Sequence, residues 1–175
     1  MCQSFCRVAL TGFMGAGKST VGQLLASALD WDFLDVDKHI EASGGASAKE
    51  LFATLGEAAF RNLESDVLVS RMARASAIIA PGGAAIDMPR NRQILGSSSD
   101  TLIVFLDAPF ATLITRCLLE EQRGNATYRP LLHKTDMALE RFSVRRSLYS
   151  AHAHLIVDVA ETVSLISETM RGATT

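Results

Sequence analysis

The segment GFMGAGKS, residues 12–19, limits what this chain can fold into more than any other feature. It matches the phosphate-binding P-loop pattern G-x-x-x-x-G-K-[ST], in which glycines let backbone N–H groups converge on an anion at a helix N-terminus. The apolar run at residues 5–10 before it is typical of a buried strand, and apolar residues at helical spacing follow it. This order of strand, glycine loop and helix is the one the motif requires, so we predict a site for nucleotide phosphates here.

The P-loop also predicts individual contacts. Lys18 can reach the β- and γ-phosphates, and the Ser19 hydroxyl can bind Mg²⁺. The residues predicted to bind the nucleotide in this segment are Gly15, Ala16, Gly17, Lys18, Ser19 and Thr20. The alternative is a glycine-rich turn that binds nothing, and the combination of strand, spacing, lysine and serine disfavours it.

Length and composition limit the class of the protein. Its 175 residues predict one domain over the whole chain, and a hydrophobic fraction of 48% suffices for a full core. The formal net charge of −2 gives no bulk basic field, so we expect no nucleic-acid partner. No stretch approaches the roughly 20 apolar residues of a membrane span, and the first apolar run lacks the basic region of a signal peptide. The three cysteines show no C-x-x-C spacing, as in proteins of a reducing compartment. We expect a cytoplasmic protein that acts as a monomer on small molecules, without a membrane partner.

Apolar runs alternate with helical patterns along the chain, which predicts the α/β class with a parallel sheet and crossover helices. The expected strands are residues 5–10, 32–34, 77–80, 101–106 and 155–157. Most of these runs are apolar on both faces, so we expect helices to cover both sides of the sheet.

Helix signals fill the intervals between these runs. Ser47 and Glu50 match a capping box, and a long helix is predicted over residues 56–75. Its expected apolar face consists of Phe60, Leu63, Val67 and Leu68. Pro109 suits the first turn of a later helix, and a C-terminal helix is expected at about residues 162–170.

Two carboxylates follow the second predicted strand, at the sheet edge where ligands of open α/β sheets bind. Alternate residues at a strand end point to the same side, so Asp35 and Asp37 can both face one site. One can help to hold Mg²⁺ through water, and the other can orient or deprotonate a substrate hydroxyl. The alternative for Asp37 is the N-cap of a helix over residues 38–42, and it can serve in both ways.

Two further pairs of residues, one on the long helix and one after the third strand, are weaker signals on their own. Arg61 and Glu64 share one face of the long helix, where the pattern alone favours an exposed ion pair. Gly82 and Gly83 follow the third strand and permit close approach of a ligand to the backbone. An ordinary turn is the alternative for these two glycines.

A long polar and basic segment over residues 120–134 lies between two predicted helices, and such segments are functional lids or floppy insertions. Arg129 within it can swing over the transferring phosphate as an arginine finger. Arg145 or Arg146, on the helix that follows, can reach the same anion. Taken alone, all three arginines are interpreted as solvated surface charge.

The order of these segments resembles shikimate kinase, a family in the nucleoside-monophosphate-kinase-like branch of P-loop proteins. The resemblance covers nearly the whole chain and is carried by residues 12–20, 33–41, 60–64, 82–84, 129–132 and 145–149. It implies a P-loop three-layer sandwich whose five-stranded parallel sheet has the order 2-3-1-4-5. It also implies a substrate-binding helical region at about residues 37–65 and a lid at about 120–134. The implied reaction is ATP- and Mg²⁺-dependent phosphorylation of shikimate to shikimate 3-phosphate.

The resemblance also implies roles for individual residues of the acceptor site. Asp37 would bind and activate the acceptor hydroxyl, and Arg61 and Arg145 would clamp the carboxylate of shikimate. The backbone of residues 82–83 would touch the ring hydroxyls. Glu64 would orient Arg61 or the substrate.

On the nucleotide side, the resemblance implies that Lys18 and Ser19 serve the phosphates and Mg²⁺, with Asp35 binding the ion through water. Arg129 would be the lid arginine on the phosphates. Arg116 matches an arginine that packs on adenine.

The chain departs from the family pattern at two places. The family usually has three glycines after the third strand, and here Pro81, which lacks an N–H donor, stands at the first. The segment between Arg116 and Arg129 is also longer than usual. The first alternative function is a related kinase for another hydroxylated acid or polyol, such as gluconate. The second is a nucleotide-binding regulator without catalysis, which the intact Lys18 and Asp37 disfavour.

Overall fold

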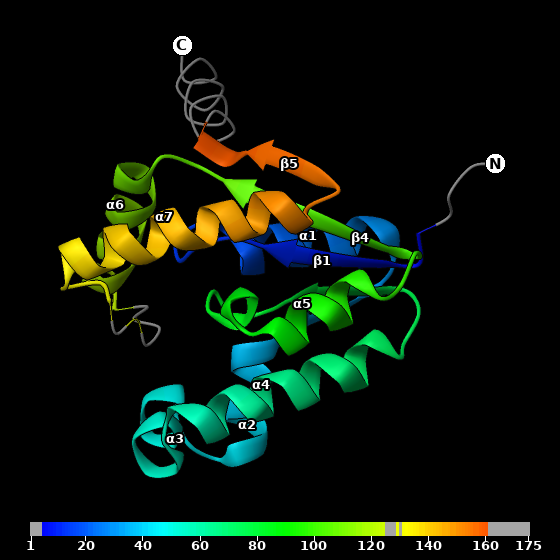
Figure 1. Ribbon diagram of the computed structural model, residues 1–175, viewed down its shortest axis with the longest axis horizontal. Coiled ribbons are helices and arrows are strands. Elements are labelled where there is room, and N and C mark those ends of the chain that lie inside the picture. The colour runs from blue at the N-terminus through cyan, green and yellow to red at the C-terminus, as the bar shows by residue number, and fades with distance from the viewer. Residues whose placement is uncertain (1–4, 125–128, 130, 161–175) are drawn as a thin grey trace.

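The computed structural model describes residues 5–124, 129 and 131–160 of the chain. The strands of this part form a five-stranded, all-parallel sheet in the order β2-β3-β1-β4-β5, which confirms the expected topology. The strands are β1 (Arg7–Thr11), β2 (Asp32–Asp35), β3 (Ala77–Ala80), β4 (Thr101–Asp107) and β5 (Leu155–Asp158). Because β1 lies at the centre, between β3 and β4, the P-loop that follows it begins in the middle of the sheet (Figure 1).

Helices cover both faces of the sheet and complete three layers (Figure 1). They are α1 (Lys18–Leu29), α2 (Val36–Gly44), α3 (Ala48–Leu55), α4 (Glu57–Met72), the 3-10 helix η1 (Ala85–Asp87), α5 (Pro89–Gly96), α6 (Phe110–Gln122) and α7 (Thr135–His152). Val8 of β1 packs with residues of α1, α6 and α7, whereas the next residue, Ala9, packs with residues of α2 to α5. Successive strand residues point to opposite faces, so the central strands are buried on both sides, as predicted.

The two edge strands differ from this prediction. Asp32 of β2 is exposed, and the rest of β2 is only half-buried. Leu155 and Ile156 of β5 are 48% and 52% exposed. The helical layers are centred on the middle of the sheet, and strands at its two ends therefore receive less cover. Burial on both faces holds for β1, β3 and β4, and the prediction is wrong for β2 and β5.

Capping side chains fix the starts of two helices. Ser47 and Glu50 form the predicted capping box, and α3 begins directly after Ser47. The N-cap of α2 is Asp35, whose side chain accepts a hydrogen bond from the Lys38 backbone N–H at 3.3 Å. The N-cap interpretation of Asp37 is therefore wrong, because α2 begins at Val36, two residues earlier than the pattern indicated, and includes Asp37.

Three details of the predicted helices are also wrong. The long helix α4 ends at Met72, earlier than the predicted end at residue 75. Leu63 is 39% exposed and does not belong to the buried face, whereas the adjacent Glu64 is 2% exposed. Pro109 is the N-cap of α6 and lies just before its first turn.

Some expectations fall on residues outside the described ones, among them the C-terminal helix at about 162–170 and the first cysteine. Cys6 and Cys117 are free thiols, as expected. Within the described residues, every helix is too short or too polar to cross a membrane.

Candidate active site

The P-loop forms the turn between β1 and α1, as predicted. Gly15 and Gly17 have φ angles of 78° and 84°, a left-handed conformation that favours glycine because it has no Cβ. A Cβ at Gly15 would lie 2.9 Å from the Cys117 sulfur on α6. Gly17 is the N-cap of α1, so the loop presents its backbone N–H groups at a helix N-terminus.

Lys18, the first residue of α1, folds back over this loop. Its Nζ donates hydrogen bonds to the carbonyl oxygens of Gly12 at 2.9 Å and Phe13 at 3.2 Å. Burial lowers the pKa of Lys18, and the carboxylates of Asp37 and Asp35 oppose this decrease. The ammonium group is therefore held at the phosphate-binding loop, near the two carboxylates that follow β2. The other predicted nucleotide contacts in this turn are Ala16, which is buried, and Thr20, which is exposed.

Ser19 and Asp35 make direct contact across the start of α1 and the end of β2. The Ser19 hydroxyl donates a hydrogen bond of 2.5 Å to Asp35 Oδ2. This pair of oxygens matches what Mg²⁺ takes from proteins, which is one or two protein oxygens with the rest of its shell from phosphates and water. The structure thus brings the two predicted metal residues together.

Asp37, in the first turn of α2, is half-buried, and its carboxyl group pairs with that of Glu64 on α4, which is buried. Burial raises the pKa of Glu64 to about 7, and the Arg61 guanidinium opposes this rise. Burial, and then the charge of Asp35, raises the pKa of Asp37. A hydrogen bond joins the two carboxyl groups and favours a proton on Glu64 and a charge on Asp37.

Gly82 packs directly against these two carboxyl groups. A Cβ at this position would lie 2.5 Å from Glu64 Oε1 and 2.7 Å from Asp37 Oδ1. At Gly83 the nearest atom to such a Cβ, the carbonyl oxygen of Gly12, is at an ordinary contact distance of 3.7 Å. A Cβ at position 82 would therefore displace these two carboxyl groups, whereas a Cβ at position 83 would meet no atom closer than an ordinary contact.

Arg61 lies between acidic and aromatic side chains on α3 and α4. Its Nη1 donates to Glu64 Oε2 at 2.6 Å, and its Nη2 lies 3.8 Å from Glu57 Oε1. The guanidinium carbon is 5.8 Å from the ring centres of both Phe52 and Phe60. The interpretation as an exposed ion pair is wrong, because Glu64 is 2% exposed and the Arg61 side chain is 19% exposed.

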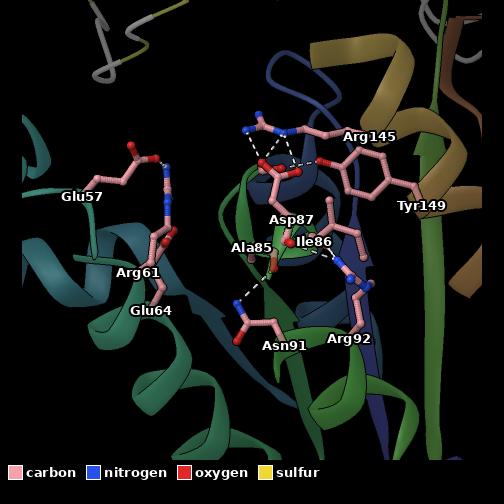
Figure 2. A network of polar contacts seen from close by, with 11 residues as sticks. Glu57, Arg61, Glu64, Ala85, Ile86, Asp87, Asn91, Arg92, Arg145 and Tyr149 are labelled. Atoms are coloured by element: carbon pink, nitrogen blue, oxygen red, sulfur yellow. Dashed lines mark hydrogen bonds and ion pairs between the residues drawn. The ribbon is translucent and has the colours of Figure 1, made fainter. Parts of the chain in front are cut away.

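Helix α7 holds the turn after β3 at two points (Figure 2). The Arg145 guanidinium donates to the Asp87 carboxylate of η1, with the shortest distance 2.7 Å from Nη2 to Oδ2. The Tyr149 hydroxyl, one turn further along α7, donates to the carbonyl oxygen of Gly83 at 2.5 Å. Burial raises the pKa of Tyr149, so its hydroxyl keeps its proton. The sequence indicated no partner for Asp87, whereas the spacing of Arg145 and Tyr149 was a signal that both share one helix face.

The two remaining predicted arginines are Arg116, which lies on α6, and Arg129, which follows that helix in the chain. Arg116 on α6 donates from Nη2 to the carbonyl oxygen of Val159 at 2.7 Å. Arg129 pairs with the Glu120 carboxylate and donates to the carbonyl oxygen of Cys117 at 3.3 Å. Neither geometry tests the predicted contacts with adenine and phosphate. Within the predicted lid at about residues 120–134, residues 125–128 and 130 lie outside the described ones.

The arrangement as a whole combines three chemical capacities at the carboxyl end of the sheet. The P-loop with Lys18 can bind a phosphate chain, and the pair of Ser19 and Asp35 can hold a divalent cation. Asp37 is a half-buried carboxylate of raised pKa, which suits a general base. Arg61 and Arg145 lie on α4 and α7, two helices that both contact η1.

Known proteins resemble this chain in both sequence and fold. The family model described as "Shikimate kinase" matches residues 14–172. A shikimate kinase of Chlorobium chlorochromatii is 39% identical over 123 residues, which are 70% of this chain and 60% of that protein. One from Geobacter sulfurreducens is 38% identical over 155 residues, 87% of this chain and 81% of that protein.

Solved structures agree with these relatives. A structure titled "Shikimate kinase from Acinetobacter baumannii in complex with shikimate" aligns with a TM-score of 0.77 and 28% identity, and covers 95% of this chain and 96% of that one. A gluconokinase of Sinorhizobium meliloti aligns with a TM-score of 0.52 and 20% identity, over 90% of this chain and 85% of that one, which shows a shared fold only. The family model and the relatives together settle the resemblance seen in the sequence: the chain belongs to the shikimate kinase family.

Proposed function

We propose that this protein transfers the γ-phosphoryl group of ATP to a hydroxyl of shikimate and forms shikimate 3-phosphate, a step of aromatic amino-acid (chorismate) biosynthesis. The observation that carries the proposal is the placement of the Asp37 carboxyl group, which lies beside Glu64 and Gly82 and near the P-loop lysine, and whose pKa is raised. A carboxylate that is more basic than usual accepts a proton more readily. Its position near the phosphate-binding loop is where an acceptor hydroxyl must meet the γ-phosphate. Family membership then indicates which acceptor is used.

The residues of the chain contribute to transfer by positioning and by charge. Asp37 accepts the proton of the attacking hydroxyl, and its charge is maintained because Glu64 carries the proton that the two carboxyl groups share. Lys18 stabilises the negative charge that develops on the transferring oxygens. Arg129 adds a second positive charge over the phosphates after it leaves Glu120.

Ser19 and Asp35 are the residues that fit Mg²⁺, the first by direct contact and the second through water. When bound, the ion neutralises charge on the phosphate oxygens. The hydrogen bond between these two side chains holds both oxygens at the site before the nucleotide arrives.

The acceptor binds through its carboxylate and its ring hydroxyls. Arg61 and Arg145 suit a carboxylate because a guanidinium offers a planar fork of donors. Gly82 and Gly83 bring backbone N–H groups to the ring. Pro81 is buried and lacks an N–H, so it shapes the turn and leaves the donors to the two glycines.

The organisation of the molecule follows from these roles. One kinase domain spans residues 1–175, with a substrate-binding region at about 37–65 and a lid at about 120–134 that carries Arg129. Gly15, Ala16, Gly17 and Thr20 complete the phosphate cradle, and Arg116 packs on adenine. The protein acts as a cytoplasmic monomer without a nucleic-acid partner.

A coupled assay of ADP release tests this function. Shikimate should support Mg²⁺-dependent turnover, and gluconate should not, although the fold is shared with a gluconokinase. ADP release of equal rate without any acceptor would contradict the proposal. Turnover with gluconate but not with shikimate would keep the kinase and replace the acceptor.

A further inference from the structure

Asp87 and Arg145 form a bidentate ion pair in the acceptor region. The Asp87 carboxylate accepts from Arg145 Nε at 3.0 and 3.1 Å and from Nη2 at 2.7 Å. We propose that Asp87 is a positioning residue of the phosphoryl-transfer site, which fixes the Arg145 guanidinium so that its remaining edge faces the carboxylate of the acceptor. This inference rests on the proposed function, since it needs an acceptor that carries a carboxylate.

The pair leaves half of the guanidinium available for a second anion. Arg145 has five N–H donors, and Asp87 occupies only the edge formed by Nε and Nη2. Within the described residues, Nη1 makes no hydrogen bond. The edge formed by Nη1 and Nη2 can therefore bind a second carboxylate in the planar, bidentate manner that guanidinium groups favour.

The available edge lies on the acceptor side of the site. Figure 2 shows Arg145 reaching from α7 across Asp87, with its guanidinium at the end that faces the group around Arg61. The guanidinium carbon lies 5.9 Å from the ring centre of Phe13 in the P-loop. Arg145 is thus held between the phosphate-binding loop and the turn that carries Gly82.

Asp87 can orient the arginine because its own backbone is fixed from the opposite side. Arg92 Nη1 donates to the carbonyl oxygens of Ile86 at 2.7 Å and Asp87 at 2.9 Å. Asn91 Nδ2 donates to the carbonyl oxygen of Ala85 at 3.0 Å. These bonds from α5 to η1, drawn in Figure 2, hold the short helix in place. The Asp87 carboxylate is therefore a fixed reference point for the longer and more adaptable Arg145 side chain.

The pair also admits the opposite function, in which Asp87 competes with the acceptor for Arg145. The geometry favours positioning, because both anions can share the guanidinium without displacement. Separation of the pair would also leave two partly buried charges without compensation, since their side chains are 32% and 12% exposed. The two functions predict opposite changes in acceptor affinity when the charge of Asp87 is removed.

The test measures the kinetics of Asp87→Asn with shikimate and ATP. This change keeps the size of the side chain and removes its charge and one acceptor oxygen, so the guanidinium is no longer fixed. The KM for shikimate should rise about ten- to a hundredfold, the range expected when one hydrogen bond to a charged group is lost. The kcat should change less than the KM, and the KM for ATP should stay the same.

A matched control comes from the same helix. Arg146 binds Asp107 with the same side-on geometry, at 2.7, 3.0 and 3.1 Å, so Asp107→Asn should leave the KM for shikimate unchanged. Asp87→Glu, which retains the charge, should recover part of the affinity and separates an electrostatic role from a loss of fold.

The outcomes distinguish this inference from the proposed function. An unchanged or lower KM for shikimate in Asp87→Asn, in a parent protein that phosphorylates shikimate, would overturn the inference alone. The same rise in KM in the Asp87→Asn, Asp87→Glu and Asp107→Asn variants would also overturn it. A parent protein without turnover of shikimate would overturn both.

Discussion

Replacing Glu64 by glutamine should change how the stability of the protein depends on pH. Burial raises the pKa of Glu64 from its ordinary value of 4.5 to about 7. Between these values the folded protein keeps a proton that the unfolded chain has released, so the contribution of Glu64 to the free energy of unfolding falls as the pH rises. At about 1.4 kcal/mol for each unit of pKa, the full decrease is on the order of 3 kcal/mol.

The magnitude can be stated for a practical pH range. From about pH 5 to about pH 8, Glu64 should reduce the stability of the parent protein by about 2.5 kcal/mol. Glutamine keeps the shape of the protonated side chain and does not titrate, so this decrease is absent in Glu64→Gln. Asp37 titrates together with Glu64, and the comparison therefore reports the proton that the pair shares.

Urea unfolding of both proteins across this range measures the difference, because groups that titrate equally in both cancel. Glu57→Gln is the matched control, since Glu57 lies on the same helix and faces the same arginine but its side chain is 70% exposed. The stability of Glu64→Gln relative to the parent should increase with pH, whereas that of Glu57→Gln should stay constant. Parallel curves for the parent and Glu64→Gln would refute the reasoning.

Three further predictions follow from the geometry of the site. Asp37→Asn should lower kcat by about 10²- to 10⁴-fold while the affinity for ATP, measured by calorimetry, is nearly unchanged; loss of ATP affinity with kcat retained would exchange the roles of Asp35 and Asp37. Gly82→Ala should destabilise the protein and abolish turnover because its Cβ meets two carboxyl groups, whereas Gly83→Ala should retain the melting temperature; equal melting temperatures would contradict this. Pro81→Gly should change kcat/KM for shikimate only a few-fold and lower the melting temperature, with a loss of about 0.4–1 kcal/mol; a large gain of activity would show that Pro81 selects another acceptor.

The sequence predicts the fold well because the signals of the fold are local or periodic. The P-loop, the capping box at Ser47 and the short apolar runs each depend on neighbouring residues. Strand ends were accurate to within a residue or two, since β1 begins at Arg7 and β2 ends at Asp35. The predicted burial of β2 and β5 on both faces was wrong because the apolar pattern of a short run does not show how far the helical layers extend toward the edges of the sheet.

The sequence predicts the acceptor site less completely, because its energetics depend on burial. Periodicity on α4 indicated a buried Leu63 and an exposed Glu64, and the structure shows the reverse. A carboxyl group is buried there because Arg61, Asp37 and Gly82 surround it, and these partners come from three separate elements. The pairing of Asp87 with Arg145 joins residues 58 positions apart, and no local pattern indicates such a contact.

The most direct measurement of the central claim is the identity of the product. The protein is incubated with ATP, Mg²⁺ and shikimate, and the mixture is followed by phosphorus and proton magnetic resonance. The account predicts one shikimate 3-phosphate for each ADP, and no product with Lys18→Ala, which lacks the ammonium group at the P-loop. Formation of ADP and free phosphate without a phosphorylated acceptor, or equal turnover by Lys18→Ala, would contradict it.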